Sequence, residues 1–130
     1  MIEFVLDGRS KVNTYVQLIQ QVKQALRVGL LTAGDQLPKV RDVAQSLAIN
    51  PNTVLKAYRE LEHEGLVSAR PGVGTFVTRT LTDHSLAAHG PLRQDLQRWL
   101  TKARKAGLDD ESIEALFMTT FRTAAQEDIA

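Results

Sequence analysis

The chain has 130 residues, of which 43% are hydrophobic and 24% are charged, and it contains no cysteine. The length favours a single domain with at most a small appendage, and the missing cysteines exclude a disulfide scaffold, a thiolate metal site and a cysteine nucleophile. No apolar run approaches the ~20 residues that cross a bilayer, and the first residues lack the pattern of a signal peptide. We therefore expect a cytoplasmic protein without a membrane partner.

The net charge of +1 does not by itself indicate a nucleic-acid partner. Residues 1–80 carry 10 basic and 7 acidic side chains, whereas residues 81–130 carry 6 and 8. This mild asymmetry predicts different roles for the two parts of the chain.

The first strong helical pattern lies between residues 15 and 26. Its apolar side chains recur every three or four positions, which lays one apolar stripe along about four turns of helix. The stripe consists of Tyr15, Leu18, Ile19, Val22, Ala25 and Leu26. Gly29 is expected to end this helix, and Gly34 and Pro38 predict a loop over residues 30–38.

Two further helices follow with a short connection between them. The first, at residues 40–47, has apolar residues at positions i, i+3, i+4 and i+7. Asn50 and Pro51 predict the start of the second, because asparagine caps free backbone N–H groups and proline is tolerated at the first helical position. Gly65 is expected to end it. The apolar stripe of this helix consists of Val54, Ala57, Tyr58 and Leu61.

After Gly65 the apolar period changes from helical to alternating. Residues 66–70 and 75–79 have the pattern of short strands and flank a glycine-rich stretch at residues 71–74. This arrangement predicts a β-hairpin directly after the second of the paired helices.

Residues 81–90 show no period and are expected to form a linker to a helical segment at residues 91–130. Two helices of this size do not enclose a core by themselves, since chains below ~40 residues normally need a metal, a disulfide or association. We expect their apolar side chains to hold a homodimer. These side chains are Leu92, Leu96, Trp99, Leu100, Ile113, Leu116, Phe117 and Phe121. The alternative is that they fold back onto the first helix and form one monomeric core.

The order of elements predicts a winged helix-turn-helix, so the expected fold class is mainly α with a small β-hairpin and a two-helix C-terminal dimerisation segment. The DNA-binding domain is expected over residues 1–80. Its second paired helix would enter the major groove of double-stranded DNA, where amide, hydroxyl and ammonium groups reach base edges and phosphates. Side chains suited to this task are Asn50, Asn52, Thr53 and Lys56. Gly72 and Gly74 would let the hairpin backbone approach the sugar-phosphate surface, with Arg70 beside them.

Five motifs follow one another in unbroken order within residues 10–79. They are Leu37-Pro38-Lys39-Val40-Arg41-Asp42-Val43-Ala44, Asn50-Pro51-Asn52-Thr53-Val54, Ala57-Tyr58-Arg59-Glu60-Leu61-Glu62, Glu64-Gly65-Leu66-Val67 and Gly72-Val73-Gly74-Thr75-Phe76-Val77. Together they closely resemble the GntR family of bacterial transcription regulators, and the short helical tail is similar to its YtrA-type subfamily. The resemblance implies a homodimeric repressor that binds an inverted-repeat operator.

By position, Arg41 matches the family arginine that precedes the recognition helix and contacts DNA. The four polar residues at the start of the recognition helix match its contact zone, and the two hairpin glycines match the wing tip. The chain departs from the family pattern at Lys39, where serine is usual and where lysine could add a phosphate contact. It also departs at Pro71 and Val73, where many members carry basic wing residues.

Simpler interpretations stay open for some of these residues. Arg41 could form an exposed salt bridge, and capping alone accounts for Asn50. His63, His84 and His89 have no metal-ligand spacing, and no nucleophile with a base stands out, so we expect no metal, no cofactor and no enzyme. The alternative function is a winged-helix module that binds another protein. The sequence does not indicate whether a small-molecule effector exists.

Overall fold

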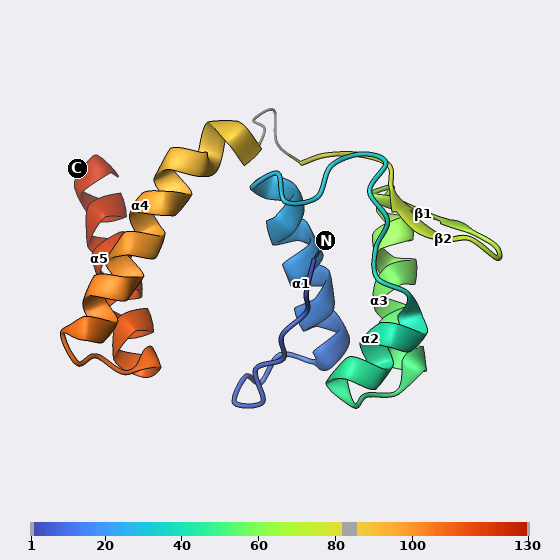
Figure 1. Ribbon diagram of the computed structural model, residues 1–130, viewed down its shortest axis with the longest axis horizontal. Coiled ribbons are helices and arrows are strands. Elements are labelled where there is room, and N and C mark those ends of the chain that lie inside the picture. The colour runs from blue at the N-terminus through green and yellow to red at the C-terminus, as the bar shows by residue number, and fades with distance from the viewer. Residues whose placement is uncertain (1, 82–85, 130) are drawn as a thin grey trace. The chain divides into compact units, whose positions relative to one another are not determined.

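The computed structural model describes residues 2–81 and 86–129 of the chain, which divides into two compact units, residues 1–89 and residues 90–130 (Figure 1). The described residues form five helices and one two-stranded antiparallel sheet, which confirms the expected fold class. In chain order the elements are α1 Thr14–Arg27, α2 Val40–Leu47, α3 Pro51–His63, β1 Val67–Arg70, β2 Gly74–Val77, α4 Leu86–Lys105 and α5 Asp110–Ile129.

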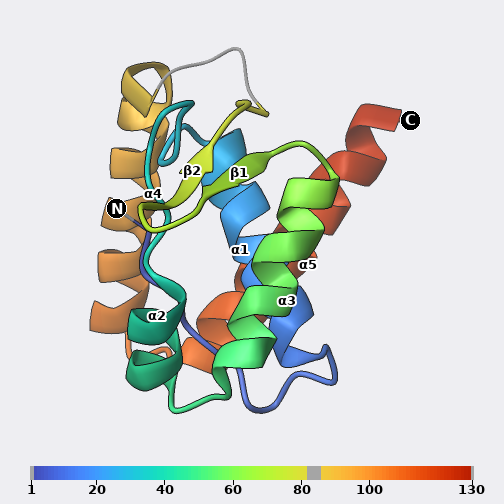
Figure 2. The ribbon, with the colours of Figure 1, turned by 90° about the vertical axis from the view of Figure 1, so that its right-hand side faces the viewer.

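A turn of three residues joins α2 to α3, as the sequence predicts (Figure 2). Ala48 ends α2 with a left-handed backbone, φ 55°, and the N–H of Ile49 donates to the Ala44 carbonyl at 3.0 Å. Asn50 begins α3 as an N-cap, because its side-chain oxygen accepts the backbone N–H of Asn52 at 2.9 Å. The turn is therefore held at both ends by local hydrogen bonds.

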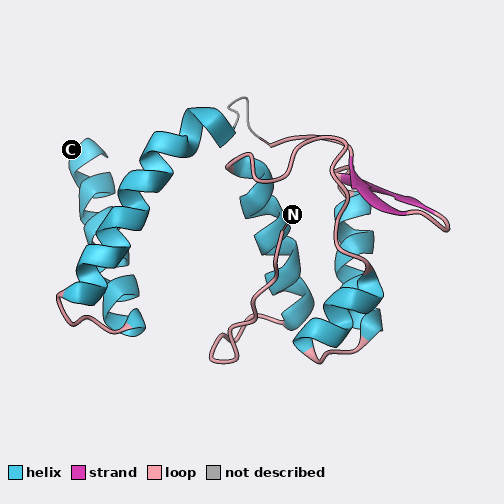
Figure 3. Ribbon diagram, viewed as in Figure 1, coloured by secondary structure: helices cyan, strands magenta, loops and turns pink. Residues whose placement is uncertain are grey.

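The hairpin is closed by residues 71–73, and its register runs from Val67 opposite Val77 to Arg70 opposite Gly74 (magenta in Figure 3). β2 ends at Val77, two residues earlier than the sequence pattern indicates. β2 also forms backbone hydrogen bonds with residues 34–37, which precede α2.

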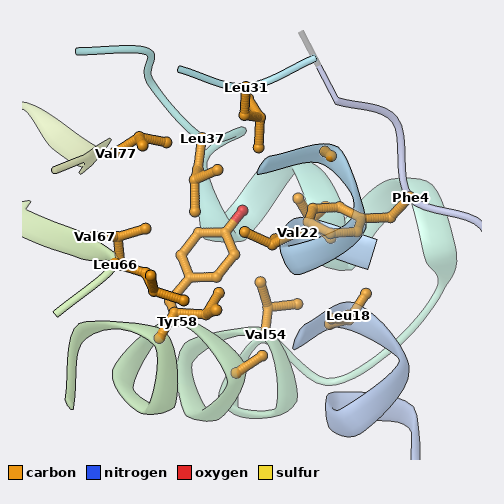
Figure 4. Packing of buried hydrophobic residues seen from close by; sticks show 14 of the residues in the cluster. Phe4, Leu18, Val22, Leu31, Leu37, Val54, Tyr58, Leu66, Val67 and Val77 are labelled. Atoms are coloured by element: carbon orange, nitrogen blue, oxygen red, sulfur yellow. The ribbon is translucent and has the colours of Figure 1, made fainter. Parts of the chain in front are cut away.

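The core of the first unit lies between α1, α3 and the hairpin (Figure 4). The predicted stripe of α3 is buried along its whole length, and α1 and α2 both pack against α3. The largest fully buried side chains are Leu18, Leu26, Leu31, Leu37, Leu61, Val22 and Val54. Phe4 is also buried, so the segment before α1 contributes to this core.

The second unit is a hairpin of two helices with little interior. Gly107, with φ 93°, lies in the connection between α4 and α5, and the Asp109 side chain caps α5 by accepting the Ser112 N–H at 2.8 Å. Hydrogen bonds from the Ser112 side chain and backbone also hold the pKa of Asp109 below its ordinary value. Ala103 and Ile113 are the buried hydrophobic residues among those described in this unit.

The expectation of a linker through residue 90 is wrong for residues 86–90, which are helical. Residues 82–85 lie outside the described residues. Pro91 stands inside α4. About one and a half turns of α4 precede Pro91, which has no backbone N–H to donate within the helix.

Tyr58 provides a test of this core. Its hydroxyl donates a 2.6 Å hydrogen bond to the carbonyl oxygen of Pro38, and burial raises its pKa, so the hydroxyl stays protonated. Tyr58→Phe leaves that carbonyl without its donor and should lower the free energy of unfolding by about 1–2 kcal/mol. Urea unfolding followed by far-UV circular dichroism measures the change. Tyr15→Phe is the matched control, and an equal loss in the two variants would contradict this role of the hydroxyl.

Candidate nucleic-acid interface

The first turn of α3 presents the polar side chains that the sequence singles out. Asn50 and Asn52 are exposed and Thr53 is half-buried. The capping role predicted for Asn50 is confirmed, and it occupies the side-chain oxygen. Asn50 therefore keeps its amide N–H groups as donors toward a ligand, whereas Asn52 keeps both its donor and its acceptor.

Lys56 lies one turn further along α3 and is exposed, but it has a partner within the chain. Its ammonium nitrogen lies 4.0 Å from the centre of the Tyr15 ring on α1. This cation–π contact contributes about 0.5–1 kcal/mol at an exposed site, so it orients the side chain without neutralising its charge. Sequence reasoning missed the pair because the two residues belong to different helices.

Lys39 and Arg41 lie at the start of α2. Lys39 is the N-cap residue, and both side chains are exposed. Neither of them forms an ion pair with any residue that the structure describes, so the salt bridge considered for Arg41 is not observed there. Their positive charges remain available to an anionic ligand.

A groove lies between the start of α2 and the hairpin. Its lining brings Lys39 together with the predicted wing residues Arg70, Gly72 and Gly74, and Tyr58 forms part of its wall. The Arg70 guanidinium carbon lies 4.4 Å above the ring of Phe76, so this charge is held beside β2. Gly72 has φ 75°, a backbone region that favours glycine in the tight turn at the tip.

The first turn of α3 does not line this groove. The predicted DNA-contacting residues therefore form two neighbouring groups, one on α3 and one between α2 and the hairpin. Gln36, which also borders the hairpin, is a residue that sequence reasoning missed. Nothing in its immediate sequence marks it, because its partner lies 37 residues away.

Within residues 2–81 and 86–129, none of the helices combines the length and apolar character needed to cross a membrane. The same described segments hold no group of three or more His, Asp or Glu side chains placed to bind a metal ion. His84 lies outside the described residues, as does the side chain of His89.

The predicted dimerisation residues of α4 and α5 differ in exposure. Ile113 is only 6% exposed and packs within the helical hairpin, whereas Trp99 and Leu100 are half-buried. The Trp99 and Phe117 ring centres are 6.5 Å apart, and Phe117 stacks on Phe121 at 6.1 Å. The exposed apolar side chains, from 38% to 70%, are Leu92, Leu96, Leu116, Phe117, Met118 and Phe121.

Comparison with known proteins places this geometry in a family. Residues 14–77, from the start of α1 to the end of β2, match the model of the bacterial regulatory proteins of the gntR family. The HTH-type transcriptional repressor YtrA of Bacillus subtilis is 36% identical over 112 residues, which cover 83% of this chain and 84% of the relative.

Two solved structures resemble three quarters or more of the chain. YtrA from Sulfolobus acidocaldarius, a GntR-family transcription factor, has 30% identity and a TM-score of 0.55, over 75% of this chain and 97% of that chain. A transcriptional antiterminator from Listeria monocytogenes EGD-e has 27% identity and a TM-score of 0.56, over 92% and 90%.

These matches confirm the resemblance drawn from the sequence motifs, and they agree with the expectation of a regulator rather than an enzyme. The family match covers the paired helices and the hairpin together, which are the elements that carry the two groups of exposed polar residues. The chain therefore belongs to the GntR family of bacterial regulatory proteins and is a DNA-binding transcriptional regulator.

Proposed function

We propose that this regulator acts in the cytoplasm as a homodimeric repressor and binds an inverted-repeat operator through α3, the start of α2 and the hairpin wing. The observation that carries the proposal is the exposed, polar first turn of α3 beside two basic side chains without ion-pair partners among the described residues. Repression rather than activation follows the Bacillus subtilis relative.

In this proposal the first turn of α3 lies in the major groove. Asn52 is better suited than Asn50 to recognise a base, because a bidentate pair with adenine needs one free donor and one free acceptor. Asn50 uses its acceptor for the cap, so it donates to a phosphate or to a single base acceptor. Thr53 adds a short contact to a base edge, and Lys56 reaches a phosphate from its place on Tyr15.

The start of α2 supplies the positive charge. Arg41 presents a planar guanidinium that can pair with the two acceptors of guanine, whereas the single ammonium of Lys39 suits a phosphate. Across the groove, Gly72 and Gly74 allow the wing backbone to come close to the sugar-phosphate surface, with Arg70 beside it.

The second unit supplies the dimer. Its described residues bury few apolar side chains and leave six large ones exposed, and an apolar surface of this kind is typical of an interaction site. A second copy provides the same surface by two-fold symmetry. The symmetry also provides two recognition helices, which an inverted repeat requires at half-sites ~34 Å apart or a multiple of this spacing.

Arg41→Ala should lower operator affinity by about 1–3 kcal/mol and relax the base preference at one position of each half-site. Fluorescence anisotropy with operators selected from random oligonucleotides measures both effects. Arg27→Ala, which removes an exposed arginine at the end of α1, is the control. Unchanged affinity in the Arg41 variant would remove this residue from the proposed interface.

Lys39→Ala should weaken binding to all DNA sequences alike, because a phosphate contact carries no base information. The slope of log affinity against log salt concentration should become shallower by about 0.9, the value for one phosphate contact. Lys23→Ala is the matched control, since Lys23 already pairs with Glu64 at 2.9 Å. A loss confined to one base position would show that Lys39 reads a base instead.

Replacing Leu92 and Phe121 together by aspartate should convert a dimer to a monomer, because both side chains are more than 60% exposed and lie outside the interior of the helical hairpin. Sedimentation velocity measures the mass, and circular dichroism checks that the helices persist. Gln97→Asp adds one negative charge on the polar face of α4 and should leave the dimer intact. A wild-type chain that already sediments as a monomer would refute the two-fold arrangement.

A further inference from the structure

The wing is bordered by an extended segment, residues 34–37, which the sequence pattern assigns to a loop (Figure 2). Three backbone hydrogen bonds of 2.8 Å join it to β2: Gly34 N–H to the Val77 carbonyl, Val77 N–H to the Asp35 carbonyl, and Leu37 N–H to the Thr75 carbonyl. This segment therefore continues the sheet on the outer side of β2.

Gln36 lies in the middle of this segment and extends its side chain toward the wing tip. Its amide nitrogen donates a 3.3 Å hydrogen bond to the carbonyl oxygen of Val73. A side chain added at Gly74 would collide with this same amide nitrogen. Gly74 also has φ 148°, a backbone conformation that favours glycine.

The same segment is anchored to the recognition helix. Leu37 is 1% exposed and lies in the core, and the next carbonyl along the chain, that of Pro38, accepts the Tyr58 hydroxyl of α3 at 2.6 Å. Continuous contacts therefore run from the wing tip through Gln36 and residues 37–38 to α3.

We infer that Gln36 is a positioning residue for DNA binding, which fixes the wing tip relative to α3 without needing to touch DNA itself. The inference rests on the proposed DNA contact of the wing. Val73 is 57% exposed, and the charge of Arg70 is held back over Phe76. The wing tip therefore depends on placement rather than on long basic side chains that could adjust their reach.

Gln36→Met keeps the length and neutrality of the side chain and removes its donor, so it is the sharpest test. We expect operator affinity to fall on the order of 3- to 10-fold, the range for one lost hydrogen bond. Hydroxyl-radical footprinting should lose the protection given by the wing at each half-site, while the protection given by α3 and the melting temperature remain. Gln45→Met, on the exposed side of α2, is the matched control.

A double-mutant cycle distinguishes placement of the wing from a general structural effect. Val73→Asp puts a negative charge at the tip and should itself weaken binding. If Gln36 acts through the wing, Gln36→Met adds no further loss in that background, because the contact it supports is already gone. Additive losses, or a lowered melting temperature in Gln36→Met, would assign Gln36 a structural role and overturn the inference.

The two proposals fail in different ways. If the wild-type chain binds its operator and Gln36→Met keeps its affinity and footprint, the positioning role is wrong and the proposed function stands. If the wild-type chain binds no DNA sequence preferentially at low salt, the proposed function fails, and the inference about Gln36 fails with it.

Discussion

Burial of one face of α3 determines the arrangement of the first unit. Val54, Ala57 and Leu61 are fully buried, and Tyr58 is nearly so, against α1, α2 and β1. Each fully buried valine or leucine contributes about 1.5–3 kcal/mol, whereas an exposed ion pair such as that of Lys23 with Glu64 contributes about 0–1 kcal/mol. The apolar stripe therefore sets the rotation of α3 about its axis, and this rotation leaves the first-turn polar side chains on the solvent side.

Tyr58 connects this buried face with the side of the unit that carries the proposed DNA interface. Its ring belongs to the core and also forms a wall of the groove between α2 and the wing. Its hydroxyl holds the Pro38 carbonyl immediately before α2 begins. One side chain thus ties the recognition helix to the start of α2, and the neighbouring segment ties both to β2.

The two units differ in how completely they bury their apolar side chains. The first unit has a closed core that includes residues from its N-terminal segment, its helices and its hairpin. Among the described residues of the second unit, Ala103 and Ile113 are buried, and aromatic side chains remain on the surface. The chain thus combines one unit that buries its own core with a second unit whose apolar surface is suited to association.

The sequence by itself determines the features that depend on neighbouring residues. The helical periods of α1, α2 and α3, the cap at Asn50, the end of α3 just before Gly65 and the hairpin are all local, since each follows from side-chain spacing or backbone preference within a few residues. The polar first turn of α3 is likewise visible in the sequence. These polar residues occupy the helix positions that the apolar stripe leaves free, and the helical period of the stripe identifies those positions.

Only the tertiary structure decides which partner each side chain meets. The contact of Lys56 with Tyr15, the pairing of residues 34–37 with β2, and the hydrogen bond from Gln36 to Val73 all join residues far apart in the chain. A hydrophobic period shows which face of a helix is apolar but not what covers it, so it did not separate buried Ile113 from exposed Leu116. The lack of an apolar period over residues 81–90 also misplaced the start of α4, since the structure shows that residues 86–90 are helical.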